Sequence, residues 1–110
     1  IVDEDVLDAL GRDGFLINIG RGALVNEADL AAALAQGRIA GAGLDVFADE
    51  PHPLPALLEA PNTMLLPHVA SASDHTRDAM GQLVVDNVTS WFERGRPVTP
   101  VPESRSLLTE

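Results

Sequence analysis

Arg21, Glu50 and His68 each come shortly after an apolar run of the chain. If these runs are neighbouring parallel strands, the three side chains lie at the carboxyl edge of one sheet, where open α/β sheets bind ligands. An arginine can hold a planar anion with two hydrogen bonds, and a histidine paired with a carboxylate can move a proton. The spacing therefore predicts a site that binds an anion and transfers a proton.

Each of these residues also has an interpretation without catalysis. Arg21 could form a salt bridge or lie at a helix terminus, and a histidine that follows a strand, like His68, is often structural. Asp49 and Glu59 compete with Glu50 as the carboxylate partner of His68. Spacing alone does not choose among the three carboxylates.

Asp45 lies inside an apolar run, where a carboxylate without a partner is costly to bury. It could accept hydrogen bonds from backbone amides or contact a ligand, and the residues leave both roles open. His52 and His75 have no arginine and carboxylate context, so we expect them at the surface. The three histidines lack the spacing of zinc ligands and the chain has no cysteine, so we predict no metal site.

The composition restricts the classes of function that this chain can have. The chain has 110 residues, of which 45% are hydrophobic, as expected for one globular domain. Its formal net charge of -10 argues against nucleic acid or an anionic membrane as a partner. No stretch approaches the roughly 18 apolar residues of a membrane span. The absence of cysteine fits a reducing compartment, and we expect a cytoplasmic location.

The residue types that are missing restrict the chemistry further. The chain has no lysine, cysteine or tyrosine. It therefore contains no Schiff-base lysine, no P-loop lysine and no cysteine nucleophile. Proton transfer near neutral pH is left to a histidine or to a carboxylate with a raised pKa.

Capping residues and hydrophobic periodicity predict an alternation of helices and strands. In chain order we expect a helix over 3–10, a strand over 15–19, a helix over 26–37, a strand over 39–46, a short helical turn over 54–59, a strand over 63–66 and a helix over 73–94. The strand–helix–strand order predicts a parallel βαβ unit. The nearly continuous apolar run 15–19 predicts a strand buried on both faces.

The predicted long helix carries apolar residues at three- and four-residue spacing, which indicates core or interface packing. These residues are Met80, Leu83, Val84, Val88, Trp91 and Phe92. The tail 96–110 is rich in proline, and we expect it to be extended or disordered. Three strands with so few helices would leave one edge and one face of the sheet uncovered. We therefore interpret the chain as the carboxyl-terminal part of a larger protein.

Four stretches occur together in an order and spacing that identify a family. They are Asn18–Gly22, Gly41–Phe47, Glu50-Pro51 and Pro67-His68. Together they resemble the D-isomer-specific 2-hydroxyacid dehydrogenases, which depend on NAD or NADP. The resemblance covers nearly all of residues 1–100. Residues 76–77 and 96–101 are most similar to the glyoxylate and hydroxypyruvate reductase branch.

The resemblance implies an α/β fold, the second half of a Rossmann-type nucleotide-binding domain with parallel strands. Residues 1–70 would belong to that domain, and residues 71–110 would form the long helix and tail that return to the substrate domain. The implied reaction transfers hydride between NAD or NADP and a small 2-oxo acid to give a D-2-hydroxy acid. The resemblance also implies a homodimer.

The site residues implied by the resemblance coincide with those singled out by spacing. Arg21 matches the residue that binds the substrate carboxylate and keto oxygen, His68 the general acid/base and Glu50 its paired carboxylate. Asp45 matches an acid near the nicotinamide. The implied cofactor-binding residues are Asn18, Ile19, Gly20, Arg21, Asp45 and His68.

Some family features differ or are missing. Asn26 stands where aspartate is common, and Ala70 where glycine is common. The phosphate-binding glycine loop and most of the substrate domain are not in this sequence, so the choice between NAD and NADP and the exact substrate stay open. Two alternatives remain: a dinucleotide-sensing corepressor relative, and an inactive fragment of the enzyme.

Overall fold

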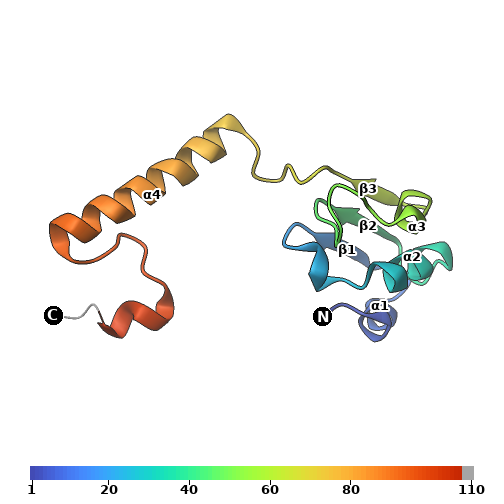
Figure 1. Cartoon of the computed structure of the whole chain (residues 1–110). Coiled ribbons are helices and arrows are strands. Elements are labelled where there is room, and N and C mark those ends of the chain that lie inside the picture. The colour runs from blue at the N-terminus through green and yellow to red at the C-terminus, as the bar shows by residue number, and fades with distance from the viewer. Residues whose placement is uncertain (108–110) are drawn as a thin grey trace. The chain divides into compact units, whose positions relative to one another are not determined.

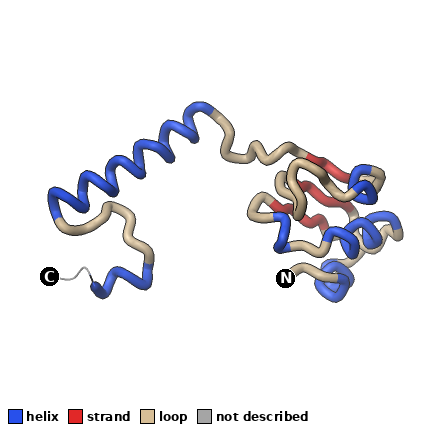
Figure 2. The backbone as a smooth tube through the Cα atoms, viewed as in Figure 1, coloured by secondary structure: helices blue, strands red, loops and turns tan. Residues whose placement is uncertain are grey.

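The computed structural model describes residues 1–107, which belong to two compact units divided between Ala70 and Ser71 (Figure 1). The first unit contains a three-stranded sheet with short helices, and the second contains one long helix followed by a folded-back segment (Figure 2). Within residues 1–107, no helix is both long enough and apolar enough to cross a membrane.

The sheet of the first unit is parallel throughout, with strand order β1-β2-β3. Its strands are β1 (Phe15–Asn18), β2 (Gly41–Leu44) and β3 (Thr63–Leu65). The helix α2 (Glu27–Ala35) connects β1 to β2, so the predicted parallel βαβ unit is confirmed. The carboxyl ends of the three strands consequently lie at one edge of the sheet.

Side-chain caps set the helix starts as the sequence predicts. The Asp3 carboxylate accepts a hydrogen bond from the Val6 amide at the start of α1 (Glu4–Leu10). The Asn26 side chain accepts hydrogen bonds from two amides in the first turn of α2. Each cap satisfies amide groups that have no carbonyl partner within the helix. The predicted short turn is present as α3 (Pro55–Leu58).

The core of the first unit lies on one face of the sheet. Its buried residues are Leu7, Val25, Leu30, Ala31, Ala33, Leu34, Ile39, Ala42, Leu44, Phe47 and Leu57. On the opposite face Phe15, Ile17 and Met64 remain 66–67% exposed. The expectation that β1 is buried on both faces is therefore wrong within the first unit, since no layer of residues 1–70 covers this face. The expected uncovered face of the sheet is present.

The second unit is organised by α4 (Asp74–Arg94), which begins at the cap Ser73 and ends at Gly95. Gly95 has a φ of 69°, a left-handed conformation that glycine adopts without strain. Ser90 then donates a hydrogen bond of 2.7 Å to the Arg96 carbonyl, and this bond turns the following segment back along the helix.

The tail differs from expectation. Pro102–Leu107 form a short 3-10 helix, η2, where we expected extended or disordered chain. Proline fits the first position of a helix because its missing N–H has no role there. The Ser104 amide and hydroxyl both bond to the Val101 carbonyl and close the turn. The last three residues of the predicted tail, 108–110, lie outside the described residues.

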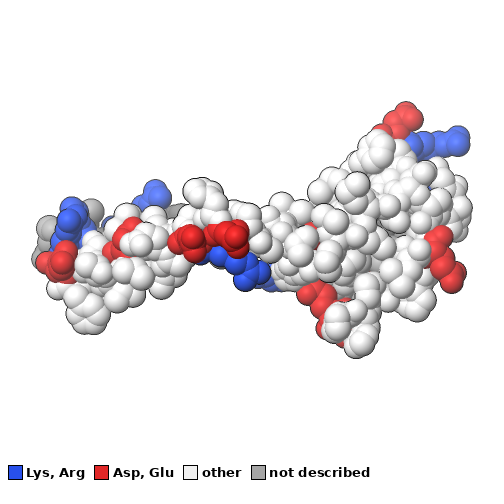
Figure 3. Space-filling view, turned by 90° about the horizontal axis from the view of Figure 1, so that it is seen from above, with Lys and Arg blue, Asp and Glu red and all other residues white. Residues whose placement is uncertain are grey.

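The apolar stripe of α4 is open to solvent in the described chain. Its side chains are 43–84% exposed, with Phe92 the most exposed of them. On the side of the molecule drawn in Figure 3, uncharged surface predominates and charged groups form small clusters. Within residues 71–107 of the second unit the side chains of the stripe are not packed in a core, and both predicted roles, core or interface packing, stay predictions.

Candidate active site

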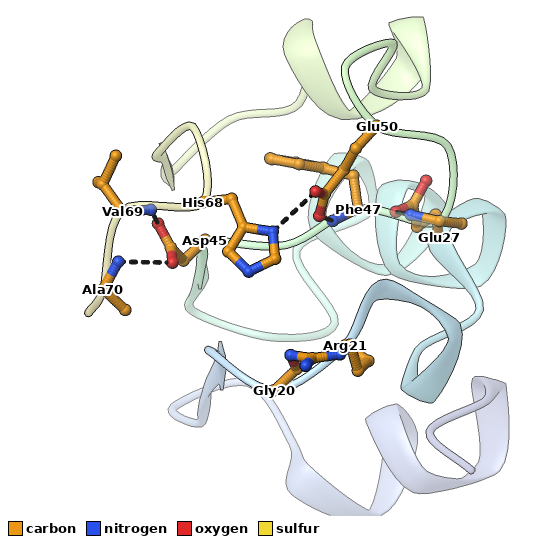
Figure 4. A network of polar contacts seen from close by, with 10 residues as sticks. Gly20, Arg21, Glu27, Asp45, Phe47, Glu50, His68, Val69 and Ala70 are labelled. Atoms are coloured by element: carbon orange, nitrogen blue, oxygen red, sulfur yellow. Dashed lines mark hydrogen bonds and ion pairs between the residues drawn. The ribbon is translucent and has the colours of Figure 1, made fainter. Parts of the chain in front are cut away.

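The carboxyl edge of the sheet brings the sequence-predicted residues together. Arg21 follows β1, Asp45 and Glu50 follow β2, and His68 follows β3. Figure 4 shows the His68 ring beside Glu50, with Arg21 on the other side of the ring in this view. His52 and His75 are exposed, as expected for surface residues.

His68 and Glu50 form a hydrogen-bonded ion pair. His68 Nδ1 lies 2.7 Å from Glu50 Oε2, and Glu50 Oε1 accepts the Phe47 amide at 2.9 Å. The hydrogen bond from His68, followed by that from Phe47, lowers the pKa of Glu50 below its ordinary value. Since an ionised carboxylate only accepts hydrogen bonds, Nδ1 carries the proton of this contact, and the other ring nitrogen, Nε2, points away from Glu50 (Figure 4). Neither Asp49 nor Glu59 pairs with His68 within residues 1–107.

The backbone around His68 is held in an uncommon conformation by Asp45. His68 has a φ of 56°, in the left-handed region that residues other than glycine seldom occupy. The next two amides, of Val69 and Ala70, donate to the two Asp45 oxygens at 2.7 and 2.8 Å. The Val69 amide is the main cause that lowers the pKa of Asp45. Asp45 is only 2% exposed. Of its two predicted roles, bonding to backbone amides or contacting a ligand, the structure shows the hydrogen bonds from backbone amides.

A second fixed turn presents Arg21. The buried Asn18 side chain accepts a hydrogen bond from the Gly20 amide at 3.1 Å and donates one to the Arg21 carbonyl at 3.0 Å. The exposed Arg21 guanidinium donates only to the Gly20 carbonyl, at 2.7 Å. It forms no ion pair within residues 1–107, so its charge is available to an anion.

A cavity of about 140 Å³ lies next to the ion pair. Its lining residues are Phe47, Glu50, Pro51, Pro53, Pro67 and His68. Most of this wall is apolar ring surface, so the Glu50–His68 contact lies beside an apolar cavity.

Two further residues support the site: Glu27, which was not singled out from the sequence, and Gly22, the last residue of the motif Asn18–Gly22. The Glu27 carboxylate accepts the Ala48 amide at 2.7 Å across 21 positions of the chain. Gly22 packs against the backbone of Phe47 and Ala48 so closely that a Cβ atom there would lie 1.9 Å from the Phe47 carbonyl carbon. Glu27 lies in the first turn of α2, a position that has no sequence signal for a distant loop contact.

The described residues fit one end of a dinucleotide. The turn fixed by Asn18 exposes Ile19, which is 67% exposed, at the same edge of the sheet as His68. This apolar surface beside a cation and a proton donor suits a nicotinamide ring and the substrate next to it. Residues 1–107 contain no group of three histidine or acidic side chains arranged to hold a metal ion.

Comparison with known proteins identifies the family. Residues 1–70 match the family described as D-isomer specific 2-hydroxyacid dehydrogenase, NAD binding domain. The chain belongs to the D-isomer-specific 2-hydroxyacid dehydrogenases. The predicted family and the Rossmann-type α/β fold are thereby confirmed.

Several members of this dehydrogenase family are similar over most of the chain. The 2-ketogluconate reductase of Gluconobacter oxydans is 55% identical over 101 residues, which are 92% of this chain and 33% of that protein. The glyoxylate/hydroxypyruvate reductase A HPR2 of Arabidopsis thaliana is 52% identical over 92% of this chain and 32% of its own length. The NADPH-dependent glyoxylate/hydroxypyruvate reductase of Sinorhizobium meliloti, solved with NADP and malonate, is 60% identical with a TM-score of 0.83. The match covers 94% of this chain and 32% of that structure. This chain thus spans about a third of the length of its relatives.

Proposed function

We propose that this chain is the carboxyl-terminal part of a reductase that uses NAD(P)H to reduce a small 2-oxo acid of the glyoxylate or hydroxypyruvate type. The product is the 2-hydroxy acid, in its D form where it is chiral. The observation that carries the proposal is the 2.7 Å contact between His68 and Glu50 at the sheet edge that also presents the Arg21 guanidinium. The similarity to 2-oxo acid reductases supports the same reaction class.

Each residue has a defined part in the proposed reaction. Arg21 binds the substrate carboxylate and polarises the keto oxygen through its planar guanidinium. The bound dinucleotide supplies the hydride. His68 in its protonated form donates the Nε2 proton to the oxygen that gains negative charge, while Glu50 holds Nδ1. Asp45 and Asn18 fix the two turns that carry His68 and Arg21.

The cofactor, location and assembly belong to the same proposal. The family match and the NADPH-dependent relative support NAD or NADP as the cofactor, with Asn18, Ile19 and Gly20 beside the nicotinamide. We place the protein in the cytoplasm because it has no cysteine and its proposed partner is a small metabolite. We propose a homodimer, which is supported by the family resemblance and by the uncovered apolar stripe on α4.

The test is turnover by the full-length protein that contains this chain. NADH and NADPH oxidation is followed with glyoxylate and with hydroxypyruvate. His68→Ala should lower kcat by about 10²–10⁴-fold, the range for loss of a general acid. His52→Ala and His75→Ala, which change exposed histidines, should remain close to wild type. Equal losses in all three variants would contradict the assignment, and tight dinucleotide binding without turnover would favour the sensing relative instead.

A further inference from the structure

The peptide group between Phe47 and Ala48 is held from outside its own loop. Its N–H, on Ala48, donates a 2.7 Å hydrogen bond to Glu27 Oε1 in the first turn of α2. Its carbonyl lies against Gly22, where a Cβ atom would come within 2.1 Å of the Phe47 oxygen. One peptide group is thus contacted on both sides by the segment that begins at Arg21.

The same loop carries the Glu50 carboxylate. The Phe47 amide donates to Glu50 Oε1 at 2.9 Å, and Glu50 Oε2 meets His68 Nδ1 at 2.7 Å. A shift of Phe47 therefore moves the support of Glu50, and with it the group that orients the His68 ring. The 3-10 turn η1 (Gly22–Leu24) follows Arg21 directly and packs against this peptide through Gly22. It therefore connects Arg21 to the loop that carries Glu50.

We propose that Glu27 is a positioning residue for the reaction proposed above. By accepting the Ala48 amide, it fixes the Phe47–Ala48 peptide against Gly22 and so sets the position of the Glu50–His68 pair relative to Arg21. This inference rests on the proposed function and extends it to a residue outside the site. This positioning role requires a side chain long enough to reach the Ala48 amide and an oxygen that accepts its hydrogen bond. The role does not require the negative charge of Glu27.

A purely electrostatic role is the competing explanation, because acidic residues in the first turn of a helix interact favourably with its dipole. Asp29 shares that first turn and helix, but its side chain contacts no loop amide within residues 1–107. Glu27 and Asp29 therefore form a matched pair, in which only Glu27 reaches the loop.

Two variants of the full-length protein separate reach from charge. Glu27→Asp keeps the charge and shortens the side chain by one methylene, whereas Glu27→Gln keeps the length and the acceptor oxygen but removes the charge. For reduction, Glu27→Asp should lower kcat by about 10–100-fold, because small displacements of catalytic groups are costly. The basic limb of its pH profile should move to lower pH, since Glu50 is held less firmly against His68. Glu27→Gln and the control Asp29→Asn should keep the wild-type rate and profile.

A second measurement keeps the test independent of turnover. The His68 ring, assigned by its absence in His68→Ala, is observed by NMR in each variant. The chemical shifts of the ring should differ from wild type in Glu27→Asp, because Glu50 then holds Nδ1 less firmly, and should be unchanged in Glu27→Gln. Asp45, which also acts electrostatically on His68, is the same in all variants. This result stands even if wild type reduces no 2-oxo acid, which would defeat the proposed function alone.

Three outcomes would overturn the inference. Impaired Glu27→Gln beside normal Glu27→Asp would assign the effect to charge. A wild-type kcat and wild-type ring chemical shifts in Glu27→Asp would show that the Ala48 contact does not position the pair. The same shift in Asp29→Asn would make it a general property of α2. Thermal melting identifies any variant that fails to fold, and an impaired but folded Glu27→Gln is sufficient on its own to reject the proposal.

Discussion

Arg21 and His68 each retain a donor that no other side chain of residues 1–107 engages. The Arg21 guanidinium contacts only the Gly20 carbonyl, and the Nδ1 atom of His68 is bound to Glu50 while Nε2 is left for a substrate. A 2-oxo acid presents the complementary groups, a planar carboxylate and a carbonyl oxygen. Single substitutions can therefore separate anion binding from proton transfer.

For anion binding, Arg21→Lys in the full-length protein should raise KM for the 2-oxo acid and also lower kcat. Lysine keeps the charge but cannot reproduce the two-pronged contact or polarise the carbonyl from the same group. Losing a charge-assisted bidentate contact should reduce kcat/KM by roughly 30–1,000-fold. Steady-state kinetics measure this change. If NAD(P)H affinity collapses while kcat/KM at saturating cofactor survives, Arg21 belongs to the cofactor site.

For proton transfer, Glu50→Gln should move the basic limb of the pH profile of reduction to lower pH. The hydrogen bond from His68 lowers the pKa of Glu50, so the carboxylate is ionised at neutral pH and can pair with the protonated ring that reduction requires. A neutral amide removes that support, and the protonated ring required for reduction is lost earlier as pH rises. The profile of kcat/KM against pH tests this, with Glu59→Gln as the control. An unchanged profile with full activity would make Glu50 an ordinary loop residue.

Among the helices and strands, local signals were sufficient to predict much of the fold. Asp3, Asn26 and Ser73 cap their helices as expected, because a cap depends on residues within one turn. Burial of the strands was harder to predict. The apolar run of β1 is what a strand covered on both faces requires, yet which face is covered depends on elements far away in sequence.

The same limit applies to the candidate site. Parallel strands place Arg21, Glu50 and His68 at one edge, so their proximity could be predicted from topology. Glu50 could be chosen over Asp49 as the partner of His68 only from the family resemblance or from the structure, since a loop side chain can turn in several directions. The Glu27 contact, 21 positions from its loop amide, has no local pattern from which it could be predicted.

The hydrogen bonds of Asp45 connect the end of β2 to the turn after β3. These bonds predict that the stability of the folded protein depends on pH. The folded-state pKa of Asp45 lies below its ordinary value, chiefly because of the Val69 amide. A depressed pKa adds stability above the unfolded value, and this is lost as pH falls through the folded value. In full-length protein, Asp45→Asn should lower the midpoint of urea unfolding at pH 7, and its difference from wild type should shrink from about pH 5 to 3. A difference that is constant with pH would contradict the ionised role.

On the scale of the whole molecule, the chain brings the candidate site residues together but leaves some of its apolar surface uncovered. The site residues from Asn18 to Ala70 lie in the first unit, whereas one face of its sheet and the α4 stripe are uncovered in residues 1–107. Because the chain spans about a third of the length of its relatives, these surfaces fit contacts made by further sequence. We therefore expect the 110-residue chain to hold the candidate site residues without the cofactor binding of the full-length protein.

The last prediction concerns the 110-residue chain by itself, which should neither bind NAD(P)H measurably nor reduce a 2-oxo acid. Dinucleotide phosphates bind where a glycine-rich turn opens the N-terminus of a helix. Here α1, α2 and α4 all begin with acidic residues in their first turns, and the net charge is -10, so phosphates are repelled. Titration of NADPH fluorescence with purified chain, after circular dichroism has verified its helices, tests this against the full-length protein. Binding by the isolated chain as tight as by the full-length protein would show that residues 1–110 contain a phosphate site of another kind.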